Sequence, residues 1–231
     1  MFVAWRELRF ARGRFVLIGS VVALITLLVG FLSGLTAGLA SQNVSGVLSL
    51  PADRIVFSAS ATESATGASF SDSTIAQEQA TEWGRRSGVD AAHPIGISQT
   101  RAEAGNARTA IALFGVDSGF DSGAPSADGR LGLSDSAAAD LDVNIGDTVT
   151  IAGIEFVVST IDGDWWYSHT PVVQMTLHDW QRYSAATGSP DAYATVLAIT
   201  GNPDWAGTDT AVGTVSKWGL TSNGTVVGAK G

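Results

Sequence analysis

Apolar residues are concentrated in one uninterrupted run near the start of the chain. From residue 15 to residue 40 the sequence FVLIGSVVALITLLVGFLSGLTAGLA contains no charged side chain. As an α-helix, these 26 residues would be about 39 Å long, which is enough to cross a hydrocarbon layer of about 30 Å with some tilt. The pattern therefore predicts a transmembrane helix over 15–40.

A cleaved signal peptide is the alternative interpretation of this run. The residues before it are basic, and the small residues around Gly38 and Ala40 resemble a cleavage site. The apolar core of a signal peptide is about 7–15 residues long, however, and this run is well beyond that length. We favour an uncleaved anchor, and both interpretations place the rest of the chain outside the cytoplasm.

After residue 40 the pattern changes to short segments separated by turn residues. The chain leaves the predicted helix through residues 41–52, with Pro51 as a break. Runs of β-branched and aromatic residues predict strands at 54–58, 89–104 with an interruption at His93-Pro94, 107–117, 148–151, 154–161, 171–175 and 193–200. Helical spacing and capping residues predict short helices at 74–86, 133–143, 177–186 and 203–219.

The mixture of strands and helices without strict alternation predicts an α+β domain. We expect a cytoplasmic segment at 1–14, the transmembrane helix at 15–40 and an extracytoplasmic domain at 41–231. The stretch 118–132 is rich in Gly, Ser, Asp and Pro, and it is the expected boundary if the domain has two subdomains.

Charge gives the orientation. Four arginines and one glutamate lie in the first fourteen residues, a net charge of +3, whereas the whole chain carries −9. Arginine beside a membrane span stays in the cytoplasm, so the acidic remainder lies on the other side. Such an acidic domain would repel phosphate, and we expect no nucleic-acid partner.

The N-terminal segment MFVAWRELRFARGRF has two interpretations. Its arginines are a topology signal whose side chains extend to the membrane surface. Alternatively, Phe2, Trp5, Leu8 and Phe15 recur near helical spacing and predict an amphipathic surface helix on which a partner could dock.

Motifs of enzymatic chemistry are missing from the sequence. There is no phosphate-binding loop, no dinucleotide fingerprint, no G-x-S-x-G and no H-E-x-x-H, and there is no cysteine for thiol chemistry. We therefore expect a protein that is not an enzyme. If ATP drives it, a partner subunit hydrolyses the ATP.

The segment 162–180 is unusually aromatic, and it also contains two histidines and one methionine. In one interpretation its rings fill a core or lie against lipid headgroups. In the other they line a site for a flat apolar ligand, because Tyr, His and Met are haem-iron ligand types. Tyr167 and His169 are two residues apart and would share a face on a strand.

Two stretches carry a resemblance to a known family. AWRELRFARGRFVLIGSVVALITLLVGFLSGLTAGLA running into LPADRIVFS, and LSDSAAADLDVNIGDTVTIAGIEFVVSTI followed by WYSHTPVVQMTLHDWQ, resemble the N-terminal part of MacB/FtsX-type ABC transporter permeases. The closest branch is the actinobacterial one that includes DevC-like and HrtB-like haem-export permeases.

The resemblance implies a MacB-like extracytoplasmic domain between the first and second of four transmembrane helices. It also implies a permease that forms a homodimer and pairs with cytoplasmic ATPase subunits. The sequence ends at Gly231, where family permeases continue into three further helices, so we expect the N-terminal portion of an exporter permease. The alternative is a stand-alone single-pass binding or sensory protein.

The haem branch of the family implies a cargo and a site. We expect efflux of haem or another amphipathic compound, with no cofactor held by the chain itself and no metal other than haem iron. The expected ligand-binding residue is Tyr167, with Trp165, Trp166, His169 and Met175 as its neighbours.

Overall fold

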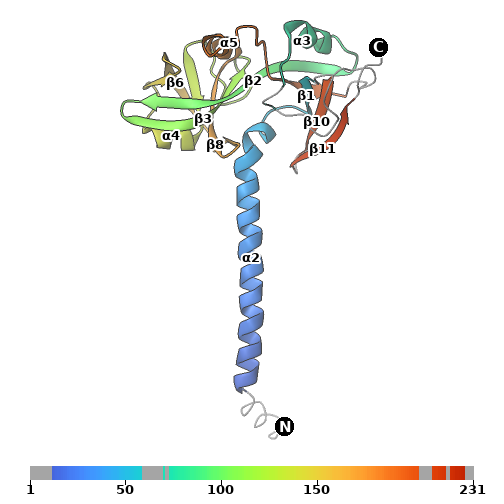
Figure 1. The fold of residues 1–231 in the computed structure, drawn as a ribbon, viewed down its shortest axis with the longest axis vertical. Coiled ribbons are helices and arrows are strands. Elements are labelled where there is room, and N and C mark those ends of the chain that lie inside the picture. Colours follow the sequence, from blue (N-terminus) through green and yellow to red (C-terminus); the bar gives the residue numbers. More distant parts are fainter. Residues whose placement is uncertain (1–11, 59–69, 71–72, 203–209, 217–218, 227–231) are drawn as a thin grey trace. The chain divides into compact units, whose positions relative to one another are not determined.

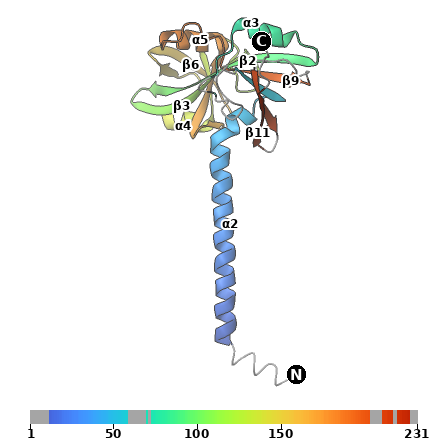
Figure 2. The same ribbon diagram turned by 45° about the vertical axis from the view of Figure 1, so that its right-hand side comes forward.

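The computed structural model describes residues 12–58, 70, 73–202, 210–216 and 219–226 (Figure 1 and Figure 2). The chain divides into two compact units, Met1–Ser41 and Gln42–Gly231.

The first unit is dominated by helix α2 (Arg12–Leu48), which continues into the second unit. Within it Val16–Thr36 is long and apolar enough to cross a membrane, and none of these 21 residues is buried against other parts of the protein. The hydroxyl groups of Ser20, Thr26 and Thr36 donate to backbone carbonyls one turn earlier. These three hydroxyl groups therefore have a partner within the helix, which lowers the cost of placing them in lipid.

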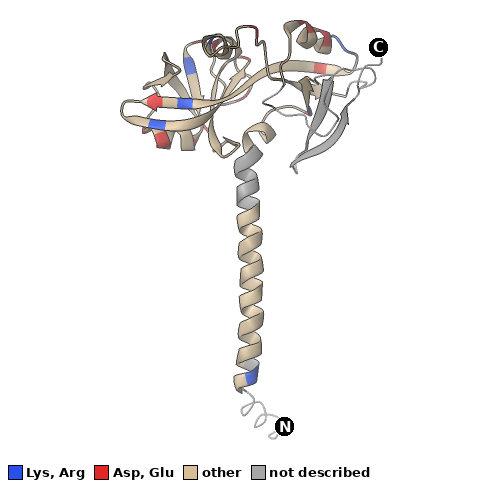
Figure 3. Ribbon diagram, in the orientation of Figure 1, with Lys and Arg blue, Asp and Glu red and all other residues tan. Residues whose placement is uncertain are grey.

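The boundaries of α2 correct one expectation. We expected the helix to end at residue 40, but it continues to Leu48. Val47 and Leu50 are buried in the second unit, and this burial stabilises the last helical turn and the chain that follows it. Figure 3 shows charge at the beginning of α2 and none along the rest of its described length, so the predicted apolar span is confirmed.

The second unit is an α+β domain, as predicted. Its helices are α3 (Gln77–Gly84), α4 (Asp135–Leu141) and α5 (Leu177–Ala186). Its strands are β1 (Arg54–Ser58), β2 (Val89–Ala104), β3 (Ala107–Val116), β4 (Arg130–Leu133), β5 (Thr148–Ile151), β6 (Ile154–Ile161), β7 (Trp166–Tyr167), β8 (Thr170–Thr176), β9 (Val196–Gly201), β10 (Thr210–Ser216) and β11 (Gly219–Val226).

Six strands pair in a closed ring in the order β2-β3-β8-β4-β6-β5, because β5 also pairs with β2. Two of the pairings, β3 with β8 and β4 with β6, are parallel and connect distant parts of the sequence. The ring encloses an apolar core that includes Leu113, Leu131, Phe156 and Met175. The segment 118–132, which we considered as a subdomain boundary, links β3 to β4 within this ring.

A second sheet shares strand β2 with the ring. The part of β2 from Val89 to Ile95 pairs with β9, and the part from Gly96 onward pairs with β3. At the passage between the two sheets, the Thr195 hydroxyl accepts a hydrogen bond from the Ile97 backbone N–H at 2.8 Å. The sheet continues through β9, β1, β10 and β11, with α3 packed near β2 (Figure 1).

Two of our secondary-structure predictions are wrong. We expected an interruption at His93-Pro94, but β2 is continuous because pairing with β9 extends through Pro94. We expected a helix over 203–219, but Thr210–Ser216 forms β10, and the remaining residues of that range other than Gly219 lie outside the described part. The predicted helix at 74–86 exists but begins only at Gln77.

Trp180 of α5 fills a gap that two facing glycines leave in the β2–β3 pair. Gly96 and Gly115 are partners in the strand register, and a Cβ atom on either would lie within 2.6 Å of Trp180 atoms. The Trp180 ring is buried, and its Nε1 donates to the Ser98 hydroxyl at 3.0 Å. The indole therefore fixes α5 against the strands.

We expect Gly115→Ala to destabilise the domain by about 1–3 kcal/mol, because the new methyl group overlaps the Trp180 Cβ and Cγ atoms. For a domain of this size the thermal midpoint should fall by roughly 3–10 °C, measured on the full chain in detergent. Gly84→Ala is the matched control, because a Cβ there meets nothing within 4 Å. An unchanged midpoint for Gly115→Ala would show that the indole is not confined by this strand pair.

Candidate functional site

The aromatic segment forms a hairpin followed by a helix. Strands β7 and β8 pair through Trp166 with Pro171 and Tyr167 with Thr170, which leaves Ser168 and His169 as a two-residue turn. Both turn residues have positive φ angles, 49° and 62°, as a type I′ turn requires. Our expectation that Tyr167 and His169 share a strand face is therefore wrong, because His169 lies in the turn and is exposed.

Tyr167 lies at the edge of an apolar cluster. Its ring is partly buried and contacts Phe70 and Phe114 edge to face, with centroids 5.5 and 5.7 Å away. Burial raises the pKa of the Tyr167 phenol, so the side chain is held in its neutral form. Trp165 packs against the same cluster.

Trp166 is attached to the end of helix α2. Its backbone N–H donates to the Ser45 hydroxyl at 2.8 Å, and the same hydroxyl donates to the Trp166 carbonyl at 3.3 Å. Gly46 next to it has no room for a Cβ, which would lie 2.8 Å from the Val172 side chain. The Trp166 indole Nε1 donates to Asp164 at 2.9 Å. Trp166 therefore has a clear structural role.

Met175 lies apart from these residues. It is fully buried in the core of the ring together with Val173, whereas Val172 on the other face of β8 belongs to the cluster beside Tyr167. The structure thus brings Trp165 and Tyr167 onto one apolar cluster, and it places Met175 on the opposite face of β8. Their ligand-binding role remains a prediction.

A hollow of about 430 Å³ lies beside Tyr167. It is bordered by β2, by α5, by the turn after β7 and by the chain before β9. The lining residues are Phe70, Ser73, Thr74, Ile97, Ser98, Gln99, Tyr167, Ser168, Trp180, Tyr183, Ser184, Thr187, Ser189, Ala192, Ala194 and Thr195. None of these side chains is charged at neutral pH, and most are hydroxyl-bearing or aromatic.

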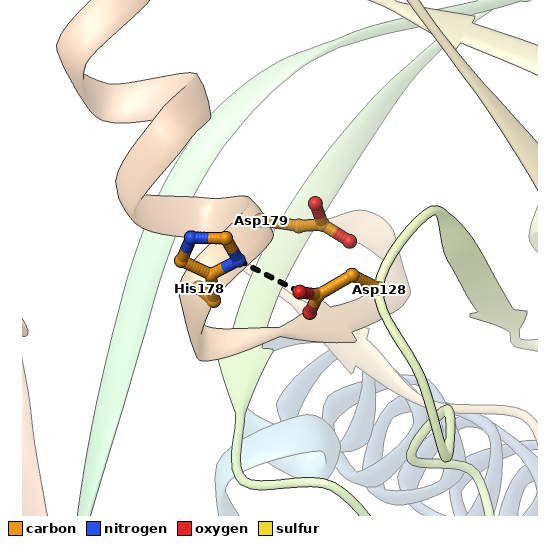
Figure 4. A group of neighbouring side chains, drawn as sticks. All are labelled: Asp128, His178 and Asp179. Atoms are coloured by element: carbon orange, nitrogen blue, oxygen red, sulfur yellow. Dashed lines mark hydrogen bonds and ion pairs between the residues drawn. The ribbon is translucent and has the colours of Figure 1, made fainter.

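A second group, which sequence reasoning missed, lies at the start of α5. Asp128, His178 and Asp179 each offer a ligand atom within 4.8 Å of the others (Figure 4). The Thr176 hydroxyl donates to Asp128, and the His178 imidazole is 2.7 Å from the same carboxylate. These two hydrogen bonds lower the pKa of Asp128 below its usual value, and the bond from Thr176 has the larger effect.

Asp179 in this group is fully buried and already has protein partners. One carboxylate oxygen accepts from the Gly129 backbone N–H at 2.6 Å, and the other accepts from the Arg182 guanidinium at 3.0 Å. Both carboxylates accept hydrogen bonds from other groups of the protein. These bonds connect the 118–129 loop to α5. In the sequence, Thr176 followed three residues later by Asp179 is a helix-start signal. It could have indicated that these residues lie together at the start of α5.

Comparisons with known proteins were made by sequence and by structure. No protein-family model matches the chain. The hemin transport system permease protein HrtB of Staphylococcus haemolyticus is 26% identical over 183 residues, which cover 76% of this chain and 49% of the relative. HrtB of Staphylococcus epidermidis is 44% identical over 45 residues, 20% of this chain and 13% of the relative.

Solved structures with a related shape are less similar in sequence. The extracellular domain of the transporter YknZ from Gram-positive bacteria has a TM-score of 0.47 and 14% identity, and covers 64% of this chain and 82% of its own. The periplasmic region of MacB from Actinobacillus actinomycetemcomitans has a TM-score of 0.48 and 12% identity, and covers 65% and 75%.

The relatives found by sequence indicate the family that the chain resembles. The match to HrtB of Staphylococcus haemolyticus covers most of this chain. It covers only about half the length of that relative. The resemblance to the N-terminal part of MacB/FtsX-type ABC permeases, in the HrtB-like branch, is confirmed by these relatives.

Proposed function

We propose that the chain is the N-terminal portion of the permease subunit of an ABC-type exporter that is driven by a separate ATPase subunit. The observation that carries this proposal is the similarity to an HrtB permease along 76% of the chain. The order of elements agrees with it, because a candidate membrane span precedes an α+β domain.

Placement in the membrane follows from the span and its flanks. The arginines before Val16 stay in the cytoplasm, so the domain from Gln42 onward lies on the outer side. In this arrangement the partners are the lipid bilayer, a second copy of the permease and cytoplasmic ATPase subunits.

The proposed cargo is haem or another amphipathic compound. The relatives are named for hemin transport, and the β7–β8 hairpin presents an exposed His169 beside the aromatic residues Trp165 and Tyr167. Burial raises the pKa of the Tyr167 phenol, which disfavours the phenolate form that iron binds. Among the proposed residues, His169 is therefore the better candidate for contact with iron.

A stand-alone binding or sensory protein is the second candidate. The density of aromatic residues around the hollow supports a binding role that would need no ATPase. A neighbouring coding sequence with a phosphate-binding loop, or an in-frame continuation with three more apolar runs, favours the exporter.

Orientation can be tested directly because the chain has no cysteine. We expect a membrane-impermeant maleimide to label Ser118→Cys in whole cells, since Ser118 is exposed in the outer domain. Ala4→Cys, in the basic N-terminal segment, should be labelled only after the cells are broken. The reverse pattern would contradict the proposed topology.

Haem contact can be tested by titrating the full chain with hemin and following the Soret band. We expect His169→Ala to weaken hemin binding at least about tenfold if its imidazole contacts the iron. His178→Ala is the matched control, because that exposed histidine pairs with Asp128 at the start of α5. Equal affinities of both variants and the parent would exclude His169 from the site.

The exporter role is tested by isolating the N-terminally tagged protein from membranes of its own host in mild detergent. We expect an ATPase subunit to co-purify, with ATP hydrolysis that hemin stimulates severalfold if haem is the cargo. Recovery of the tagged protein from intact membranes without any ATPase would instead support the stand-alone candidate.

A further inference from the structure

The hollow beside Tyr167 has unused hydrogen-bonding groups in its wall. Tyr183 and Ser184 are only 6% and 4% exposed, yet their hydroxyl groups have no hydrogen-bond partner among the described residues. Among those residues, Gln174 Oε1 is the one fully enclosed side-chain polar atom without a partner, and it lies outside the hollow. The two hydroxyl groups are therefore not fully enclosed, and their residues line the hollow.

Other polar groups of the wall are fixed by the framework. The Ser73 hydroxyl donates to the Thr195 carbonyl at 2.6 Å, and the Thr195 hydroxyl bonds to the backbone of β2. Ser98 accepts from Trp180 Nε1, which leaves its own hydroxyl hydrogen free to donate. The wall is thus hydrogen-bonded to the strands through Ser73 and Thr195, and the Ser98 hydroxyl lies beside the Trp180 indole.

The described residues of the wall carry no charge, and this limits what the hollow can bind. A carboxylate, a phosphate or an amine would lose water there without a charged partner, which is costly. A purely apolar ligand would leave the buried hydroxyls of Tyr183 and Ser184 without partners, which also costs free energy. The best ligand is therefore neutral, with both hydroxyl groups and apolar faces.

We propose that this hollow binds a neutral sugar. A sugar ring combines hydroxyl groups on its edges with C–H faces that pack on aromatic rings, and the wall offers the partly exposed rings of Phe70 and Tyr167 for such contacts. The volume of about 430 Å³ lies within the usual range for small-molecule sites. The neutral state of the Tyr167 phenol suits a hydroxyl partner. The inference does not depend on the exporter role.

The test uses the full chain in a detergent without a sugar headgroup, because glycoside detergents would compete. Glucose, galactose, maltose and cellobiose are the neutral probes, and glucuronate and glucosamine are the charged ones. We expect at least one neutral probe to change tryptophan fluorescence saturably, because Trp180 lines the hollow, and to give saturation-transfer NMR signals. Both charged probes should bind at least about tenfold more weakly.

Two variants connect binding to this site. Ser184→Ala and Tyr183→Phe each remove one free hydroxyl, and each should weaken binding of the neutral probe by about twofold to tenfold. Ser118→Ala removes an exposed hydroxyl outside the hollow and should leave affinity and the thermal midpoint unchanged. Ser184→Leu, which fills the space, should abolish binding.

Three results would overturn the proposal. One is the absence of binding by all four neutral sugars to the folded chain. Another is equal or tighter binding of glucuronate or glucosamine. The third is unchanged affinity in both hydroxyl variants, judged on proteins with parental thermal midpoints. None of these results bears on whether an ATPase co-purifies, so the exporter proposal is tested separately.

Discussion

An uncharged apolar helix is the constraint on which the rest of the account depends. The side chains of Val16–Thr36 are exposed, and most of them are apolar and therefore more stable among lipid tails than in water. A helix also satisfies its own backbone, and the hydroxyls of Ser20, Thr26 and Thr36 bond within it. A membrane is therefore the environment in which this segment is stable.

The α+β domain is organised around one long strand. β2 belongs to two sheets, so the six-stranded ring and the second sheet cannot move independently without distorting it. Trp180 is held where β2 and β3 carry facing glycines, and the same ring forms part of the wall of the hollow. The Trp180 side chain therefore belongs both to the packing of α5 on the strands and to the wall of the candidate binding site.

Local features of this fold were predictable from the sequence, and long-range ones were not. The β5–β6 hairpin and helices α4 and α5 follow from alternation and from capping residues such as Ser134 and Thr176. The parallel pairing of β3 with β8 and the closure of β5 onto β2 join distant segments, and no local pattern encodes them. The strand at Thr210–Ser216 was wrongly predicted as part of a helix, because its one glycine, Gly213, weakens both patterns.

The candidate site shows the same division. The aromatic segment was recognised by composition, but the I′ turn at Ser168-His169 was missed because Ser-His is not among the Asn-Gly, Asp-Gly and Gly-Gly pairs that are typical of this turn. The hollow could not be predicted, since its wall combines residues from Phe70 to Thr195 that meet only in the folded domain. Ser184 stands out only when its burial and its unpaired hydroxyl are seen together.

Membrane integration of the intact chain is the most direct test of the whole account. After cell lysis, membranes washed with alkaline carbonate should retain the protein, and its intact mass should be the full 23.8 kDa of the sequence. Recovery of the uncleaved chain in the aqueous fraction would contradict a membrane-anchored permease. A shortened mass, with the apolar run removed, would identify that run as a signal peptide and contradict the account as well.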